Sequence, residues 1–247
     1  VEEYLQLISD AKSKSGIPVI ASINCISGKD WLDFASRVQD AKADALELNI
    51  FVLPTDKSKK PGYYEEKYLD IASRVKGHVS IPVSVKIGPY FTNLHYMVEQ
   101  LFYRKIAGVV LFNRFYAPDI DTDQLKITAA EVFSNPSDIR QSLRWVGMIS
   151  SGYKFQDFDI AASTGVHDGD AAVKLLLAGA NAVQVCSVLY KKGPEYVKEI
   201  LNDIKLWMDK RRYSTINEFR GNLNYQNIED PAMYERAQFM KYFSSHQ

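Results

Sequence analysis

The chain has 247 residues, of which 46% are hydrophobic and 24% are charged, a composition typical of a globular protein. Its 30 Lys and Arg residues balance 30 Asp and Glu residues, which gives no electrostatic reason to expect nucleic acid or a membrane as partner. The apolar runs are shorter than the roughly 18–20 residues that a membrane-spanning helix needs. The two cysteines, Cys25 and Cys186, form no disulfide framework. We therefore expect a cytoplasmic protein.

Short apolar segments alternate with longer amphipathic segments along the chain, which predicts a parallel sheet with crossover helices. An amphipathic helix rather than a signal peptide is predicted at 1–12. The predicted strands are 17–24, 45–50, 81–87, 108–113, 157–164 and 180–187. The helices predicted between and after them are 30–42, 64–78, 93–105, 137–150, 169–179 and 194–211. We expect residues 1–247 to form a single domain, in which 213–247 form a C-terminal cap with a last helix in AMYERAQFMKYF.

The side chains of four predicted strands distinguish between two possible α/β architectures. Alternate residues of a strand point to opposite faces. In each of these strands one face is apolar and the other becomes polar toward the carboxyl end, with the polar positions Ser22 and Asn24, Glu47 and Asn49, Ser84 and Lys86, and Gln184 and Cys186. An open, doubly wound sheet is more uniformly apolar, whereas (β/α)8 barrels carry their chemistry on inward residues at the carboxyl ends. The pattern favours a (β/α)8 TIM barrel. Because the chain begins with a helix that leads into a strand, we expect the first one or two βα units of the barrel to be absent from this chain.

Three polar residues at strand ends are the first candidates for a ligand site. Lys86 would be costly at a barrel mouth without an anionic partner, so it either holds negative charge on a ligand, forms a Schiff base, or pairs with Glu47. Asn49 and Asn113 each end a strand. An amide offers donors and an acceptor, so this pair suits a flat ligand with alternating NH and C=O groups. The alternative is that each asparagine only caps a turn.

Small residues follow the last two predicted strands. Backbone NH groups at Thr164–Gly165 and at Cys186–Ser187 would form two adjacent rims, and the last two βα loops of barrels commonly bind phosphate. Ordinary tight turns are the alternative. Asp168 is expected to cap the helix that follows. The four histidines are scattered without the spacing of a metal site, and the cysteines are interpreted as small hydrophobic residues rather than nucleophiles.

Several segments together resemble the dihydroorotate dehydrogenase family, flavin enzymes built on a (β/α)8 barrel. They are ASIN, ALELNI, IPVSVKIGPY, GVVLFN, IAASTGVHDGDAAVKLLLAGANAVQVCSVLY and STINEFRG, and they cover most of residues 17–221 in family order. The resemblance implies that the protein oxidises dihydroorotate, or a related dihydropyrimidine, to orotate in pyrimidine biosynthesis, with hydride transfer to N5 of a bound FMN. It implies a small-molecule substrate and a homodimer.

The resemblance also assigns roles to individual residues. Lys86 and Asn49 are implied to be catalytic, and Asn49 and Asn113 are implied to bind the substrate. The residues implied to bind FMN are Lys86, Ser22, Asn24, Thr164, Gly165, Cys186 and Ser187.

The segment after Asn49 departs from the family pattern. The family carries a cysteine or serine base there, in an N-x-S-C-P-N type of sequence, whereas this chain has NIFVLPTD, and Phe51, Val52 and Leu53 cannot take a proton. The phosphate turns are Thr-Gly and Cys-Ser where the family usually has Gly-Gly and Gly-Thr. We expect the loop 51–62 to act as a lid. Two other functions stay open: a phosphate-binding lyase or aldolase with Lys86 as Schiff base, and a non-catalytic flavin-binding barrel.

Overall fold

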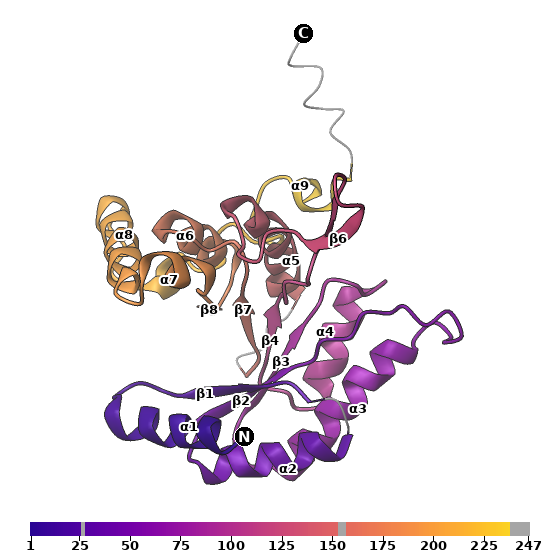
Figure 1. Ribbon diagram of the computed structural model, residues 1–247. Helices are drawn as coiled ribbons and strands as arrows, with labels where there is room; N and C mark the ends of the chain where they lie inside the picture. Colours follow the sequence, from indigo (N-terminus) through magenta and orange to yellow (C-terminus); the bar gives the residue numbers. More distant parts are fainter. Residues whose placement is uncertain (26–27, 153–156, 238–247) are drawn as a thin grey trace. The chain divides into compact units, whose positions relative to one another are not determined.

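The computed structural model describes residues 1–25, 28–152 and 157–237 (Figure 1). The chain divides into two units, one formed by Val1–Ser134 and Phe155–Thr164 and the other by Asn135–Lys154 and Gly165–Gln247. Within the described residues, no helix is long and apolar enough to span a membrane.

The first unit is built on parallel strands. Hydrogen bonds join them in the order β1–β2–β3–β4–β7. Their bounds are β1 (Ile20–Ile23), β2 (Ala45–Asn49), β3 (Val83–Ile87), β4 (Gly108–Leu111) and β7 (Asp159–Ala162). The helices of this unit are α1 (Glu2–Lys14), α2 (Gly28–Asp40), α3 (Tyr63–His78) and α4 (Leu94–Tyr103). Because successive strands are joined through helices and run parallel, their carboxyl ends meet at one edge.

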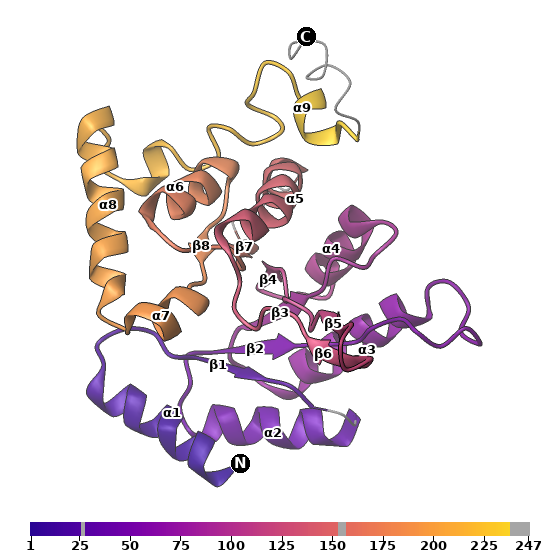
Figure 2. The same ribbon diagram turned by 45° about the horizontal axis from the view of Figure 1, so that its top comes forward.

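Alternation along the strands explains how this sheet is buried. In β3, Val83, Val85 and Ile87 are buried and the residues between them are half-buried. In β2, Leu46 and Leu48 are fully buried. Helix α2 packs on β1 and β2, helix α4 packs on β4, and α3 contacts both α2 and α4 (Figure 2). The predicted apolar face of these strands is thus the face that the helices cover. The polar face stays available for a site.

The second unit is largely helical. Its elements are η1 (Pro136–Asp138), α5 (Ile139–Gly152), α6 (Gly169–Ala178), β8 (Ala182–Val183), α7 (Ser187–Lys192), α8 (Tyr196–Arg211), η2 (Ile216–Glu218) and α9 (Ala232–Glu235). Helix α6 packs against both α5 and α8. The predicted cap is confirmed, since the Asp168 side chain accepts a hydrogen bond of 2.8 Å from the backbone NH of Ala171.

The segment after α8 is tied to the second unit by backbone hydrogen bonds. The NH groups of Gly221 and Leu223 donate to the carbonyls of Leu176 and Leu177, each at 2.9 Å. Phe219 is fully buried and contacts the ring of Trp207 with centroids 4.9 Å apart. This segment therefore packs on α6 and α8 of its own unit.

The structure differs from the sequence-based expectation in three places. A hairpin of β5 (Pro118–Asp121) and β6 (Lys126–Ala129) follows β4 where no element was predicted. The strand predicted at 180–187 is reduced to the two residues of β8, and its last predicted residue, Ser187, begins α7. The last helix ends at Glu235, and the part of AMYERAQFMKYF beyond residue 237 lies outside the described residues.

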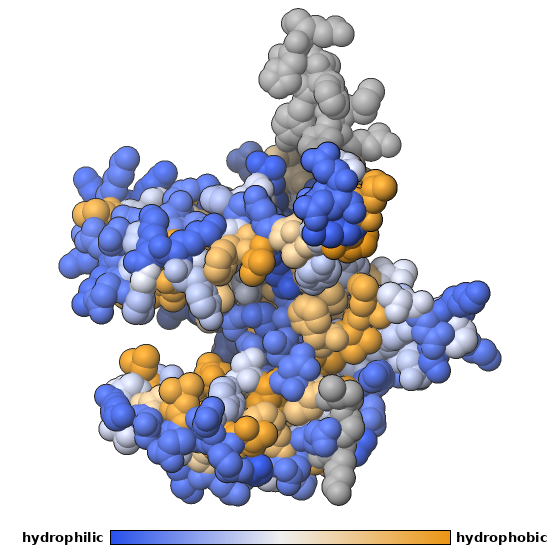
Figure 3. Space-filling view, in the orientation of Figure 1, coloured by the Kyte–Doolittle hydropathy of each residue, from blue (hydrophilic) through white to orange (hydrophobic). Residues whose placement is uncertain are grey.

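Exposed hydrophobic side chains occur in patches on an otherwise hydrophilic surface (Figure 3). On the hairpin, Ile120, Leu125 and Ile127 are all more than 60% exposed. The strands of this hairpin are short and exposed on nearly every residue, which leaves no periodic pattern from which to predict them.

Candidate active site

Asn49 and Lys86 lie directly opposite each other at the carboxyl ends of β2 and β3. Both residues are half-buried. The Asn49 Oδ1 atom is shielded from solvent and has no hydrogen-bond partner among the residues that the structure describes. A buried acceptor without a donor costs about 1–3 kcal/mol. The end of β2 thus holds a polar acceptor that no donor among the described residues satisfies.

Asn113 joins the ends of two neighbouring strands. It follows β4 and is 7% exposed. Its Nδ2 atom donates to the carbonyl oxygens of Ile50 at 3.3 Å and Lys86 at 3.4 Å, and its backbone NH donates to Ile87 at 2.8 Å. The structure therefore brings the two predicted asparagines together at one edge, but the Asn113 NH2 group is used within the protein.

Ser22 and Glu47 form a second polar pair on the neighbouring strands β1 and β2. The Ser22 hydroxyl donates to Glu47 Oε1 at 2.7 Å, and Glu47 is only 5% exposed. Tyr4 of α1 fixes the backbone of Ser22, since its hydroxyl bonds both the NH and the carbonyl oxygen at 2.9 Å. Ser22 thus contacts a buried carboxyl group, while Asn24, which follows β1, is exposed.

Three aromatic residues form a cluster at the ends of β2, β3 and β4, here called the aromatic wall: Phe51, Tyr90 and Phe115. Phe51 stacks on Phe115 with centroids 4.3 Å apart and planes 27° apart. Tyr90 meets Phe115 edge-on at 4.9 Å. Phe51 is 41% exposed and Tyr90 is 54% exposed, so the wall faces solvent. Phe51 belongs to the segment Phe51–Leu53, which stands where the family pattern has its base.

The backbone on either side of Phe51 is held by Tyr68 of α3. The Tyr68 hydroxyl donates to the carbonyl of Ile50 at 3.1 Å and accepts from the NH of Val52 at 3.3 Å. Burial of this hydroxyl raises the pKa of Tyr68 above its ordinary value. The start of the loop predicted as a lid is therefore anchored to a helix.

Thr164 and Gly165, which follow β7, both have left-handed backbone conformations, with φ of 80° and 78°. A β-branched residue adopts this conformation rarely, and Thr164 Oγ1 donates to the carbonyl of Phe112 at 3.1 Å. A Cβ atom at Gly165 would lie 2.2 Å from the backbone nitrogen of Ile139, so only glycine fits there. Strained backbone of this kind is often found at ligand sites.

The two cysteines occupy different environments. Cys186 is exposed and precedes α7, so the predicted Cys186–Ser187 turn is the start of a short helix. Cys25 is half-buried, and burial raises the pKa of its thiol to about 11. A thiol with that pKa stays protonated near neutral pH, which argues against Cys25 as a nucleophile.

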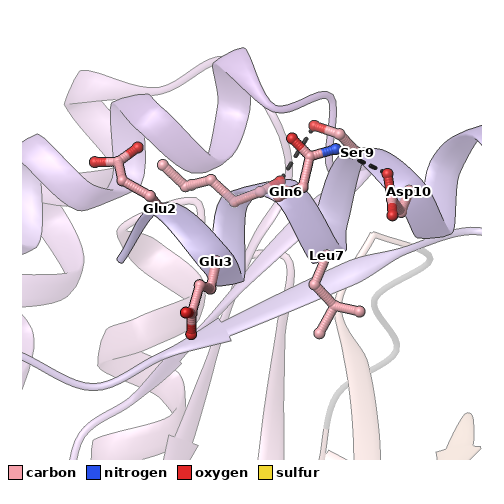
Figure 4. Close-up of a pocket in the computed structure, with 7 residues that line it drawn as sticks. Glu2, Glu3, Gln6, Leu7, Ser9 and Asp10 are labelled. Atoms are coloured by element: carbon pink, nitrogen blue, oxygen red, sulfur yellow. Dashed lines mark hydrogen bonds between the residues drawn. The ribbon is translucent and has the colours of Figure 1, made fainter.

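Cavities do not identify the site by themselves. The depression along α1, lined by Glu2, Glu3, Gln6, Leu7 and Asp10 among others, takes all its lining residues from one surface helix (Figure 4). The space between Tyr68, Tyr90 and Val52 is about 10 Å³, hardly room for one water.

Comparison with known proteins identifies first the fold of the chain and then its family. The fold resembles that of a DHODH from Eimeria tenella in complex with ferulenol, with a TM-score of 0.69 and 15% identity over 89% of this chain and 66% of that one. The prediction of a (β/α)8-barrel architecture is confirmed. The model of the family described as dihydroorotate dehydrogenase matches residues 1–208. The chain belongs to the dihydroorotate dehydrogenase family, whose enzymes are flavin-dependent dehydrogenases.

The relatives are distant. The chain is 27% identical, over 227 residues, to the dihydroorotate dehydrogenase B (NAD(+)) catalytic subunit of Methanocaldococcus jannaschii, covering 90% of this chain and 73% of the relative. It is also 27% identical, over 219 residues, to a putative dihydroorotate dehydrogenase A (fumarate) of Aeropyrum pernix, covering 88% of this chain and 69% of the relative.

Proposed function

We propose that the protein is an FMN-dependent oxidoreductase of the dihydroorotate dehydrogenase type that acts on dihydroorotate or a related dihydropyrimidine. The observation that carries the proposal is that the buried Oδ1 of Asn49, the residue opposite Lys86, has no hydrogen-bond partner in the described part of the chain. In a chain of this family, an acceptor of that kind beside a cation suits a ring with NH groups and negative charge. Under this proposal the reaction belongs to pyrimidine biosynthesis.

Under this proposal, residues at the strand ends and in the two turns would hold FMN. FMN would supply the hydride acceptor. Lys86 would place positive charge beside the isoalloxazine ring, and Ser22 and Asn24 would contact the cofactor from β1. The NH groups of Thr164–Gly165 and of Cys186–Ser187 would hold its phosphate, a proposal supported by the left-handed backbone at the first pair. Asn49 and Asn113 would orient the substrate, and Asn49 Oδ1 would accept from a ring NH.

Proton removal is where this chain differs from the family pattern. Phe51, Val52 and Leu53 offer no base, and a positioned general base typically contributes about 10²–10⁴ in rate. We therefore expect slow oxidation of dihydroorotate. The missing base also supports a second candidate, a flavin-binding protein of this family without turnover. A homodimer and a cytoplasmic location stay predictions.

The proposal is tested by adding dihydroorotate, without oxygen, to the full chain loaded with FMN and following the visible absorbance of the flavin. Slow bleaching is the expected result. An unchanged spectrum with flavin bound would contradict dihydroorotate as substrate and favour the non-catalytic candidate. Failure to retain flavin, together with borohydride trapping of a carbonyl substrate on Lys86, would favour the lyase.

A further inference from the structure

We propose that the site prefers a fused bicyclic ring with an NH–C=O edge over a single pyrimidine ring. The inference rests on the proposed function of the same site and specifies its substrate class. The residues that carry it are Asn49 and the aromatic wall. They combine one buried polar acceptor with an exposed aromatic surface on adjacent strand ends.

The wall follows the same strand ends as the polar residues. Phe51 is two residues beyond Asn49, and its ring stacks on Phe115, which is two residues beyond Asn113. Tyr90 follows β3, four residues beyond Lys86, and meets the same Phe115 ring. Each of the polar residues Asn49, Lys86 and Asn113 thus has an aromatic residue two to four positions further along the chain.

The wall is held in place before any ligand binds. A Cβ atom at Gly88 would lie 2.5 Å from the Phe115 ring, so the ring rests directly on the backbone after β3. Tyr68 fixes the residues on both sides of Phe51. A surface that is already ordered loses little conformational entropy on binding, and flat rings stack on it favourably.

A single pyrimidine ring would use only part of this site. Its NH group would satisfy Asn49 Oδ1, and its polar edges would occupy the remaining hydrogen-bonding positions. The exposed faces of Phe51 and Tyr90 would gain little from such a small, polar ring. A second, fused apolar ring would cover them, which we expect to raise affinity about tenfold.

The test compares uracil with quinazoline-2,4-dione, which has the same NH–C=O edge and an added benzene ring. Binding of each is measured by calorimetry with the full chain supplied with FMN. We expect the bicyclic compound to bind about tenfold more tightly. In Phe51→Ser and Phe115→Leu the ratio falls toward one, because the bicyclic compound loses more affinity than uracil does. Tyr96→Leu, which removes an exposed ring on α4, keeps the full ratio.

Equal or tighter binding of uracil by the wild-type protein would overturn the inference. So would an unchanged ratio in Phe51→Ser, provided that its thermal unfolding shows a folded protein. Loss of the ratio in Tyr96→Leu would also overturn it, because the preference would then come from another surface. Flavin retention is read from the visible spectrum of the same samples, so failure of the proposed cofactor is seen separately from failure of the ring preference.

Discussion

The hydroxyl of Tyr68 donates a hydrogen bond to the carbonyl oxygen of Ile50 across 3.1 Å. The same hydroxyl accepts a hydrogen bond from the backbone NH of Val52. A helix residue thereby fixes the first turn of the loop that leaves β2. Because Phe51 lies between these two contacts, the position of the aromatic wall depends in part on the Tyr68 hydroxyl.

Replacing Tyr68 by phenylalanine is expected to loosen this loop. The Val52 NH loses its acceptor in a half-buried position, which costs about 1–2 kcal/mol and lowers Tm by a few degrees. The preference for quinazoline-2,4-dione should fall at the same time. Differential scanning fluorimetry and calorimetry measure the two effects. Tyr103→Phe, an exposed tyrosine of α4, serves as the control and should change neither.

The two asparagines at the site are expected to respond oppositely to truncation. Asn49→Ala removes a buried acceptor that has no donor, so the stability of the free protein should hold or rise while uracil affinity falls about tenfold. Asn113→Ala removes the donor that serves the carbonyls of Ile50 and Lys86 and should cost about 1–3 kcal/mol. Denaturant unfolding separates the two variants. Equal destabilisation would contradict the assignment of Asn49 to ligand binding.

Gly88 allows the Phe115 ring to lie on the backbone, so Gly88→Ala should displace the ring. We expect a loss of about 1–3 kcal/mol in the free energy of unfolding and a smaller affinity ratio between the two test ligands. Gly77→Ala on α3 is the matched change, because a Cβ there meets nothing within 4 Å. That variant should be as stable as the wild type or slightly more stable, since alanine favours a helix.

Gly165 combines a left-handed backbone with close contact to Ile139. Gly165→Ala should therefore cost more than Gly62→Ala, because Gly62 is also left-handed, with a φ of 89°, but a Cβ there meets nothing within 4 Å. The second variant carries only the conformational penalty, on the order of 1 kcal/mol. Thermal unfolding of the two variants measures the difference between their losses of stability. A smaller loss at Gly165 would contradict the tight packing of the turn after β7.

Much of the fold and part of the site follow from patterns that the sequence makes visible. Alternation along β2 and β3 places Leu46 and Val85 in the core and Asn49 and Lys86 on the other face, because strand geometry leaves no other choice. Parallel connection then brings Asn113 to the same edge. These placements need only local periodicity and chain connectivity.

The aromatic wall could not be predicted in this way. Phe51, Tyr90 and Phe115 lie in loops, where side-chain direction follows from tertiary contacts such as those of Tyr68 and Gly88 rather than from a repeat. The sequence did show that Phe51, Val52 and Leu53 stand where the family carries a base. What it could not show is that the replacement stacks on a residue from another strand end.

The most direct test of the central claim is a stopped-flow experiment on the FMN-loaded full chain, mixed anaerobically with dihydroorotate. The account predicts slow bleaching of the flavin in the wild type. In Asn49→Ala, which retains flavin, it predicts bleaching at least about tenfold slower at the same substrate concentration. Equal rates in the two proteins, or a wild-type flavin that dihydroorotate never bleaches, would contradict the claim that Asn49 receives the substrate beside Lys86.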